Sequence, residues 1–257
     1  MIRLLSLETA TDRGSFCLWS GEECGQERAD APLPLAARSE ECPAGQPHAE
    51  TLLPLLRQAL SETGWAISEL DAIVVDSGPG MFTGLRVSAA LAQGLAVASG
   101  KPVIAISSLE ALAESAFIQT GVRRVLTLLD ARMNQIYAAA WSRDANGDWR
   151  AIIAPCLVNP SELDSLGPAL LSESSDGSAP IAVAGTALDE YPDAAQWCAA
   201  QSLQDSTVRY PEASAVAALG ARRFVRGEAQ DPAEALPVYV RDRVALTTAE
   251  RAAGLSL

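Results

Sequence analysis

The sequence contains one order of strands twice, and this duplication limits its fold more than any other feature. A polar turn joins two β-like runs at residues 4–9 and 15–19, and the same arrangement returns at 125–130 and 135–141. The repeat predicts two lobes of similar design. Strand–turn–strand units also recur by chance in α/β chains, so this alternative stays open.

Acids and glycines mark equivalent places in the two copies. Glu8 closes the first strand of one copy and Asp130 closes that of the other. An apolar strand followed by glycine also occurs twice, at residues 73–78 and 181–185. These correspondences extend the predicted duplication beyond the first two strands.

Helices alternate with strands in the first half of the chain. An apolar stripe predicts a helix from His48 to about Gly64. The nearly continuous apolar run at residues 71–76 is typical of a strand buried on both faces, and a second strand follows at 103–106. The segments after these strands predict helices, so the expected fold class is α/β.

The duplication also predicts where the lobes divide. We expect an N-terminal lobe at residues 1–106 and a C-terminal lobe at 107–212, with a C-terminal tail at 227–257. The helix predicted at 213–226 is expected to complete the N-terminal lobe.

Composition excludes several classes of protein. No apolar run reaches the ~18 residues of a membrane span, and the N-terminus predicts a strand and not an export signal. We therefore expect a cytoplasmic protein without membrane contact. The 19 basic residues against 32 acidic ones give a net charge of −13, which disfavours nucleic-acid binding by the chain alone.

Cysteine and histidine usage argues against metal chemistry. The five cysteines include no CxxC pair, so neither a disulfide framework nor a zinc site is indicated. His48 is the single histidine, which excludes any site that needs two histidines from this chain. We expect no cofactor.

Two loops are the weak candidates for a phosphate or cofactor site. The glycine-rich loop at residues 78–86 can present backbone N–H groups to an anion, but it lacks the lysine of a P-loop. A tight turn whose glycines allow close packing is the alternative interpretation. The turn after the first strand adds an acid and hydroxyls. The candidate residues are Glu8, Thr9, Thr11, Gly78 and Gly80.

The helix predicted after the glycine-rich loop is unusually rich in small residues. Gly94 in its interior costs ~1 kcal/mol of helix stability relative to alanine, so a closely apposed helix is expected to compensate. That helix belongs either to this chain, most simply the one that begins at His48, or to another chain.

Several motifs together resemble the TsaB family, also called YeaZ. The resemblance covers nearly the whole chain in order. It is carried by runs at residues 48–54, 76–86, 106–113 and 129–133 with Tyr137, and by the run at 237–241. Two departures stand out, since Glu8 replaces the usual Asp and Met81 stands where Ser is expected.

The resemblance implies a two-lobed actin/sugar-kinase/Hsp70-like (ASKHA) fold and a role in making N6-threonylcarbamoyladenosine beside the anticodon of tRNAs that read codons beginning with A. It implies a TsaD-like paralogue as partner, which transfers the threonylcarbamoyl group with a metal held by two histidines. A TsaE-like ATPase is expected to act through the same complex. With one histidine, this chain is expected to be a non-catalytic subunit that dimerises with TsaD and activates it. Isolated, the chain is a candidate homodimer with little direct tRNA binding.

Family members pair through the helices that correspond to residues 48–63 and 83–99. The expected interface residues are His48, Leu52, Leu56, Thr83, Arg86, Val87, Ser88, Leu91, Ala92 and Leu95. The alternative functions are an ATP-dependent kinase or ATPase of the same superfamily and a metallopeptidase. The histidine count argues against the metallopeptidase.

One local basic cluster stands against the expectation of little tRNA binding. Arg222, Arg223 and Arg226 gather near the end of the helix predicted at residues 213–226. We expect them to complement the dipole at the end of that helix, with a tRNA contact as the alternative.

Overall fold

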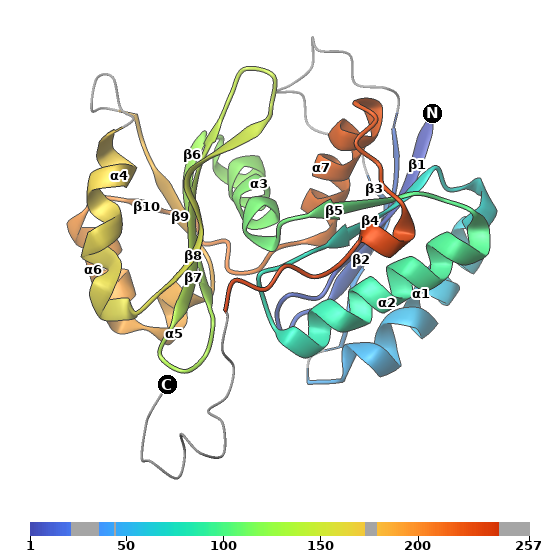
Figure 1. Cartoon of the computed structure of the whole chain (residues 1–257), viewed down its shortest axis with the longest axis horizontal. Coiled ribbons are helices and arrows are strands. Elements are labelled where there is room, and N and C mark those ends of the chain that lie inside the picture. Colours follow the sequence, from blue (N-terminus) through green and yellow to red (C-terminus); the bar gives the residue numbers. More distant parts are fainter. Residues whose placement is uncertain (22–35, 44, 173–178, 242–257) are drawn as a thin grey trace.

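The computed structural model describes residues 1–21, 36–43, 45–172 and 179–241. Two five-stranded sheets stand apart in the molecule, each with helices on both faces (Figure 1). The first sheet contains β1 (Ile2–Glu8), β2 (Ser15–Gly21), β3 (Ala36–Glu41), β4 (Ala72–Asp76) and β5 (Val103–Ile106). The second contains β6 (Arg124–Asp130), β7 (Ile136–Arg143), β8 (Trp149–Val158), β9 (Ala182–Ala184) and β10 (Gln204–Asp205).

The two sheets have the same topology. The first has the order β3-β2-β1-β4-β5 and the second, taken from its other edge, β8-β7-β6-β9-β10. In both, the first three strands pair antiparallel and the last two add in parallel. The predicted duplication and the two-lobed α/β fold class are thus confirmed. Chance recurrence would not reproduce five strands with their directions.

Helices and short 3-10 turns surround the sheets. They are α1 (His48–Thr63), α2 (Phe82–Ser99), α3 (Ser108–Thr120), α4 (Gly167–Ser172), α5 (Ala187–Glu190), α6 (Pro192–Ala200) and α7 (Ala213–Val225), with 3-10 turns at Ile67–Glu69, Pro160–Leu166 and Pro232–Glu234. Of the described helices, none is long and apolar enough to cross a bilayer.

Alternating side chains place a separate core on each face of the first sheet. Leu5 and Leu7 of β1 pack with α1 and α2 on one face, whereas Ile2 and Leu4 pack with α7 on the other. Successive side chains of a strand point to opposite faces, so both helix layers are required to bury β1. The helix predicted at residues 213–226 therefore returns to the first sheet. Whether the chain divides at residues 106 and 212 stays a prediction.

The second sheet is covered in the same way. Leu126 and Leu128 of β6 face α4, α5 and α6, while Val125 and Leu129 face α3. Helices α3 and α7 consequently meet between the two sheets (Figure 1). The part of the expected tail that follows residue 241 lies outside the described residues.

Candidate functional site

The two candidate loops lie against each other at the carboxyl edge of the first sheet. The backbone N–H of Met81 donates a 2.6 Å hydrogen bond to the Ala10 carbonyl oxygen. The Thr9 hydroxyl donates a 2.8 Å bond to the Gly84 carbonyl oxygen. These hydrogen bonds therefore join the loop after β1 to the glycine-rich loop after β4.

Glycine is required where the two loops touch. A Cβ atom on Gly80 would overlap the backbone and side chain of Ala10, and one on Gly84 would overlap the Thr9 carbonyl. The Gly78 backbone has φ +90°, a conformation that other residues rarely adopt. The glycines of this loop therefore allow a tight turn that packs against the loop after β1, and an anion at its backbone N–H groups stays a prediction.

Glu8 and Asp76 form a buried acid pair beneath this contact. They end the neighbouring parallel strands β1 and β4, whose preceding residues Leu7 and Val75 are in register. Glu8 is fully buried and Asp76 is nearly so. Glu8 Oε1 accepts a 2.8 Å bond from the Ala10 N–H, whereas Oε2 has no partner.

Burial raises the pKa of both carboxyl groups. Neither oxygen of Asp76 accepts a well-formed hydrogen bond, although the Ser88 hydroxyl and the Thr9 backbone lie nearby. Loss of solvent raises the pKa of Asp76 to about 7. Burial and then the charge of Asp76 raise the pKa of Glu8 well above its ordinary value. The pair therefore favours holding a proton.

A small cleft opens between the lobes, beside the packed loops. Its volume is about 180 Å³. Of the five candidate residues, Thr11 and Gly80 line this cleft, whereas Glu8, Thr9 and Gly78 do not. The residues that line it are Ala10, Thr11, Asp12, Gly80, Met81, Leu129, Asp130, Ala131, Arg132, Tyr137, Thr186, Asp189, Glu190 and Tyr210.

The turn between β6 and β7 forms the opposite wall of the cleft. The Tyr191 hydroxyl donates a 2.7 Å bond to Asp130 Oδ1, and Arg132 pairs with Asp130 Oδ2 at 3.1 Å. Arg132, Met133 and Asn134 all have positive φ values between 56° and 60°. Consecutive non-glycine residues in this region are strained, so outside contacts must hold the turn.

His48 lies at the start of α1 and contacts the same region. Its Nε2 is 2.9 Å from the Thr11 carbonyl oxygen, which fits an N–H donor at that position. Its ring also fills the space beside Gly14, where any Cβ would collide with it. The His48 ring is buried in packing within this chain, and its expected interface role stays a prediction.

Several other residues of the expected interface are also buried within this chain, and their part in a partner interface stays a prediction. Leu52 and Leu56 of α1, and Ser88 and Ala92 of α2, are buried in this chain. The apolar stripe of an amphipathic helix faces its own sheet, which explains why the residues chosen from that stripe point inward. Val87, Leu91 and Leu95 are only partly buried, and they too pack against this core. Thr83 and Arg86 are exposed.

The exposed stripe of α2 is different and consists of small residues. Thr83, Arg86, Ala90, Gly94 and Val97 succeed one another at helical spacing and are all exposed. No atom lies within 4 Å of where a Cβ on Gly94 would stand. Among the described residues, no apposed helix therefore compensates the cost of Gly94.

The arginine cluster at the end of α7 forms ion pairs with other elements of the fold. Arg222 and Arg223 pair with Glu114 and Glu110 of α3 at 2.7 and 2.6 Å, and Arg226 pairs with Asp148. Their partners are thus carboxylates of other elements. Complementing their own helix does not account for these contacts.

Several known proteins resemble this chain over most of its length. The profile of the family described as TsaD, tRNA N6-adenosine threonylcarbamoyltransferase, matches residues 43–249. The tRNA threonylcarbamoyladenosine biosynthesis protein TsaB of Escherichia coli is 30% identical, covering 95% of this chain and 96% of its own. The Haemophilus influenzae protein of the same name is 28% identical over 95% of each chain.

The chain belongs to the TsaB (YeaZ) family. A crystal structure of a Pseudomonas aeruginosa protein, described as similar to the peptidase YeaZ, has a TM-score of 0.74 at 29% identity. It covers 94% of this chain and 100% of that one. The family resemblance predicted from the motifs is confirmed over nearly the whole length.

Two features of this TsaB family member were not among the predicted site residues. Asp76 ends an apolar strand with an acid, as Glu8 and Asp130 do, and that signal was available in the sequence. Glu110 and Glu114 stand four residues apart on a small-residue helix, which places both on one face. Their partners on α7 are distant in sequence, so spacing alone does not reveal them.

Proposed function

We propose that this TsaB family member is a non-catalytic subunit that dimerises with a TsaD-like paralogue and activates it in forming N6-threonylcarbamoyladenosine on tRNA. The observation that carries the proposal is the contact between the two loops after β1 and β4. Gly80 and Gly84 are packed onto Ala10 and Thr9, and the Met81 N–H already donates to the Ala10 carbonyl, so no space is left for a phosphate between the two loops.

The charges of the cleft support the same conclusion against an ATPase. Asp12, Asp130, Asp189 and Glu190 line it, and Arg132 already pairs with Asp130. A nucleoside triphosphate entering here would meet carboxylates, which repel its phosphates at short range. The turn and the loop contribute no lysine to neutralise them.

Histidine usage supports the division of labour between paralogues. The resemblance implies that the TsaD-like enzyme holds its metal with two histidines, and this chain contains one. That histidine, His48, is packed against Gly14 and the Thr11 carbonyl. In the described part of the chain, no three His, Cys, Asp or Glu side chains converge as a metal site.

The interface proposed for the TsaD-like partner is the outer surface of α1 and α2. Ala90 and Gly94 of α2 leave room for a second helix backbone to approach closely, and Leu53 is exposed on α1, which packs beside α2. Val97 extends this surface, with 74% of its area exposed. Burying these groups against a partner helix would compensate the cost of Gly94.

The wider assembly follows from this role. A TsaE-like ATPase acts through the complex of the two paralogues, and the isolated chain forms a homodimer through the surface that TsaD otherwise occupies. The net charge of −13 leaves tRNA recognition to the partners. A cytoplasmic location fits an enzyme complex that modifies tRNA.

Tryptophan substitutions on α2 test the proposal. A90W and G94W place a large ring on the exposed stripe and should abolish association with the TsaD-like protein in sedimentation, together with tRNA modification by the reconstituted set. Both side chains point to solvent in the monomer, so the circular dichroism spectrum should be unchanged. A199W is the matched control, because Ala199 is an exposed alanine of α6 on the second sheet.

The outcomes separate the alternatives. Association that persists in both α2 variants moves the interface elsewhere. Full modification activity without this chain refutes the activating role. Magnesium-dependent ATP turnover by the pure chain, lost in E8A, would favour the ATPase alternative.

A further inference from the structure

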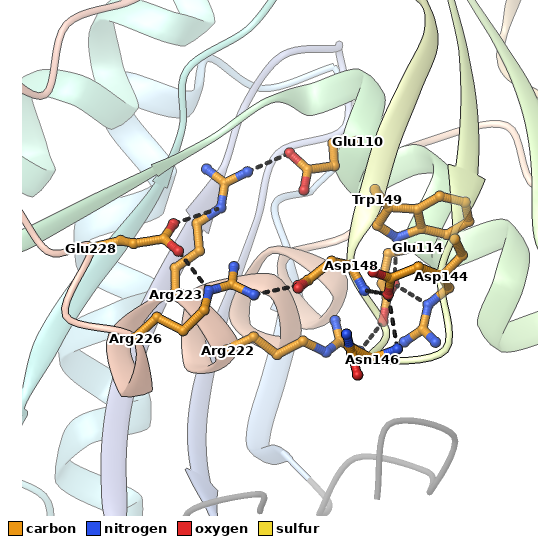
Figure 2. Close-up of polar contacts among 11 residues, drawn as sticks. Glu110, Glu114, Asp144, Asn146, Asp148, Trp149, Arg222, Arg223, Arg226 and Glu228 are labelled. Carbon is orange, nitrogen blue, oxygen red and sulfur yellow. Dashed lines mark hydrogen bonds and ion pairs between the residues drawn. The ribbon is translucent and has the colours of Figure 1, made fainter. Parts of the chain in front are cut away.

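A polar cluster joins the two lobes where α3, α7 and the β7–β8 hairpin meet (Figure 2). Arginines of α7 and β7 face carboxylates of α3, of the hairpin and of the segment after α7. Because α7 packs on the first sheet, whereas α3 and the hairpin belong to the second, the ion pairs of the α7 arginines with Glu110, Glu114 and Asp148 cross from one lobe to the other. We name this cluster the upper tie. It consists of Glu110, Glu114, Arg143, Asp148, Trp149, Arg222, Arg223, Arg226 and Glu228.

Glu114 is the centre of the upper tie. Its carboxylate accepts 2.7 Å hydrogen bonds from Trp149 Nε1 of β8 and Arg222 Nη2 of α7, and it lies 3.4 Å from Arg143 Nε of β7. The Glu114 and Arg143 side chains are each 1% exposed. A buried carboxylate with donors from three elements fixes how those elements sit, because each donor loses its partner if they shift.

Two further arginines at the end of α7 extend the upper tie toward solvent. Arg223 pairs with Glu110 at 2.6 Å and also donates to the Ala105 carbonyl of β5. Arg226 pairs with Asp148 of the hairpin and with Glu228. In Figure 2 these side chains converge from the two helices and the hairpin.

Trp149 adds an apolar contact to both lobes. Its ring packs against the core beneath α7 and against the core beneath α3, and it meets Phe117 edge-on at 6.2 Å. The same side chain therefore donates to Glu114 and fills space between the lobes.

The segment 235–241 forms a second connection, which we name the lower tie. It is anchored on the first lobe, where the Val238 N–H donates a 2.7 Å bond to the Ser77 carbonyl and the Tyr239 ring packs against Phe82 at an interplanar angle of 40°. It ends on the second lobe, where Arg241 donates to the Ala131 carbonyl at 2.9 Å and to Gln135 Oε1 at 2.7 Å.

Arg241 therefore holds the strained β6–β7 turn from outside. Its guanidinium also contacts the Arg132 carbonyl and the Met133 sulfur. Figure 1 shows this segment below the α3–α7 contact and the β7–β8 hairpin above it. The two ties share no residue.

We propose that the upper and lower ties lock the two lobes in one relative orientation, so that this chain acts as a rigid body and not as a clamp that opens and closes around a ligand. The proposal concerns the motion of the chain itself and stands apart from the partner proposed above.

A double-mutant cycle with hydrogen exchange tests the lock. E110Q with D148N weakens the outer part of the upper tie and leaves Glu114 in place, and R241A removes the lower tie. If both ties oppose the same motion between the lobes, disrupting either one alone should raise amide exchange in α3 and α7 only slightly. Together they should raise it on the order of tenfold more than the sum of the separate effects.

The control variant loses the same number of ion pairs, but each of these pairs lies within one lobe. E69Q and D205N remove contacts to Arg3 and Arg209, each inside one lobe. Exchange in α3 and α7 should be unchanged in this control, alone or with R241A. E114Q gives a second measurement, in which unfolding should separate into two transitions, one for each lobe.

Additive effects of the two ties would overturn the proposal, as would exchange that rises equally in α1 and α6. A single unfolding transition in E114Q, lowered in midpoint, would likewise show that Glu114 stabilises the fold without coupling the lobes.

Discussion

Replacing Asp76 with asparagine should remove a pH-dependent destabilisation of this protein. Asp76 and Glu8 are buried side by side with three carboxylate oxygens that lack well-formed hydrogen bonds. Burial raises the pKa of Asp76 from 3.8 to about 7 in the folded chain. The folded state therefore keeps a proton over a pH range in which the unfolded chain has lost it.

The sign and size of the effect follow from this difference. Because the folded pKa is the higher one, stability falls as pH rises from about 4 to about 7 and is constant above that range. At about 1.4 kcal/mol for each pH unit, the full fall is on the order of 4 kcal/mol. D76N carries no such proton and should escape this part of the pH dependence.

Urea unfolding followed by circular dichroism measures the effect. Between about pH 5.5 and pH 7.5, the stability of D76N relative to the natural chain should rise by about 2 kcal/mol. Two titratable groups face Asp76 directly or through its partner. Glu8 keeps a raised pKa, and burial, followed by the charge of Glu8, raises the pKa of the Cys42 thiol. The variant E8Q/D76N separates the contribution of Glu8 from that of Asp76.

D205N is the contrasting control. Hydrogen bonding to Arg209 lowers the pKa of Asp205, so this ion pair stabilises the fold above the ordinary Asp pKa and the loss in D205N should not diminish between pH 5.5 and 7.5. A constant stability difference between D76N and the natural chain over the same range would refute the reasoning. It would show that Asp76 is ionised throughout.

Three further predictions concern the helix surface, tRNA and ATP. G94A should raise the stability of the isolated chain by about 1 kcal/mol, since Gly94 lies in an exposed helix interior with open space around it; a lower melting temperature would contradict this. Filter binding at ~0.15 M salt should show no submicromolar tRNA affinity, and affinity lost on replacing Arg222, Arg223 and Arg226 with alanine would refute it. The pure chain should not hydrolyse ATP with magnesium, and turnover that disappears in E8A would show that the packed loops open.

Local patterns predicted the elements of the fold because each depends on neighbouring residues. The apolar stripe after His48 predicted α1, and the buried run at 71–76 predicted β4. The repeat of strand, turn and strand predicted two similar sheets, because pairing follows from the order of strands. The same stripe does not by itself place Leu52 and Leu56 at an interface, because periodicity marks the buried face of a helix without saying whether this chain or a partner covers it.

The site was less accessible to prediction because its contacts are long-range. Thr9 and Gly84 meet although 75 positions separate them, and only the folded sheet edge brings their loops together. Arg222 reaches Glu114 across 108 positions. From the sequence alone, Arg222 is expected to complement the dipole of its own helix, because the partial charge at the helix end lies nearest to it along the chain.

The contact of Gly80 with Ala10 and of Gly84 with Thr9 has a consequence for evolution and for engineering. Main-chain atoms of Ala10 and Thr9 occupy the volume beside Gly80 and Gly84. Introducing a lysine or an aspartate on either loop would leave that volume filled. Opening space between the two loops would therefore require insertions that move the main chain, which no point mutation provides.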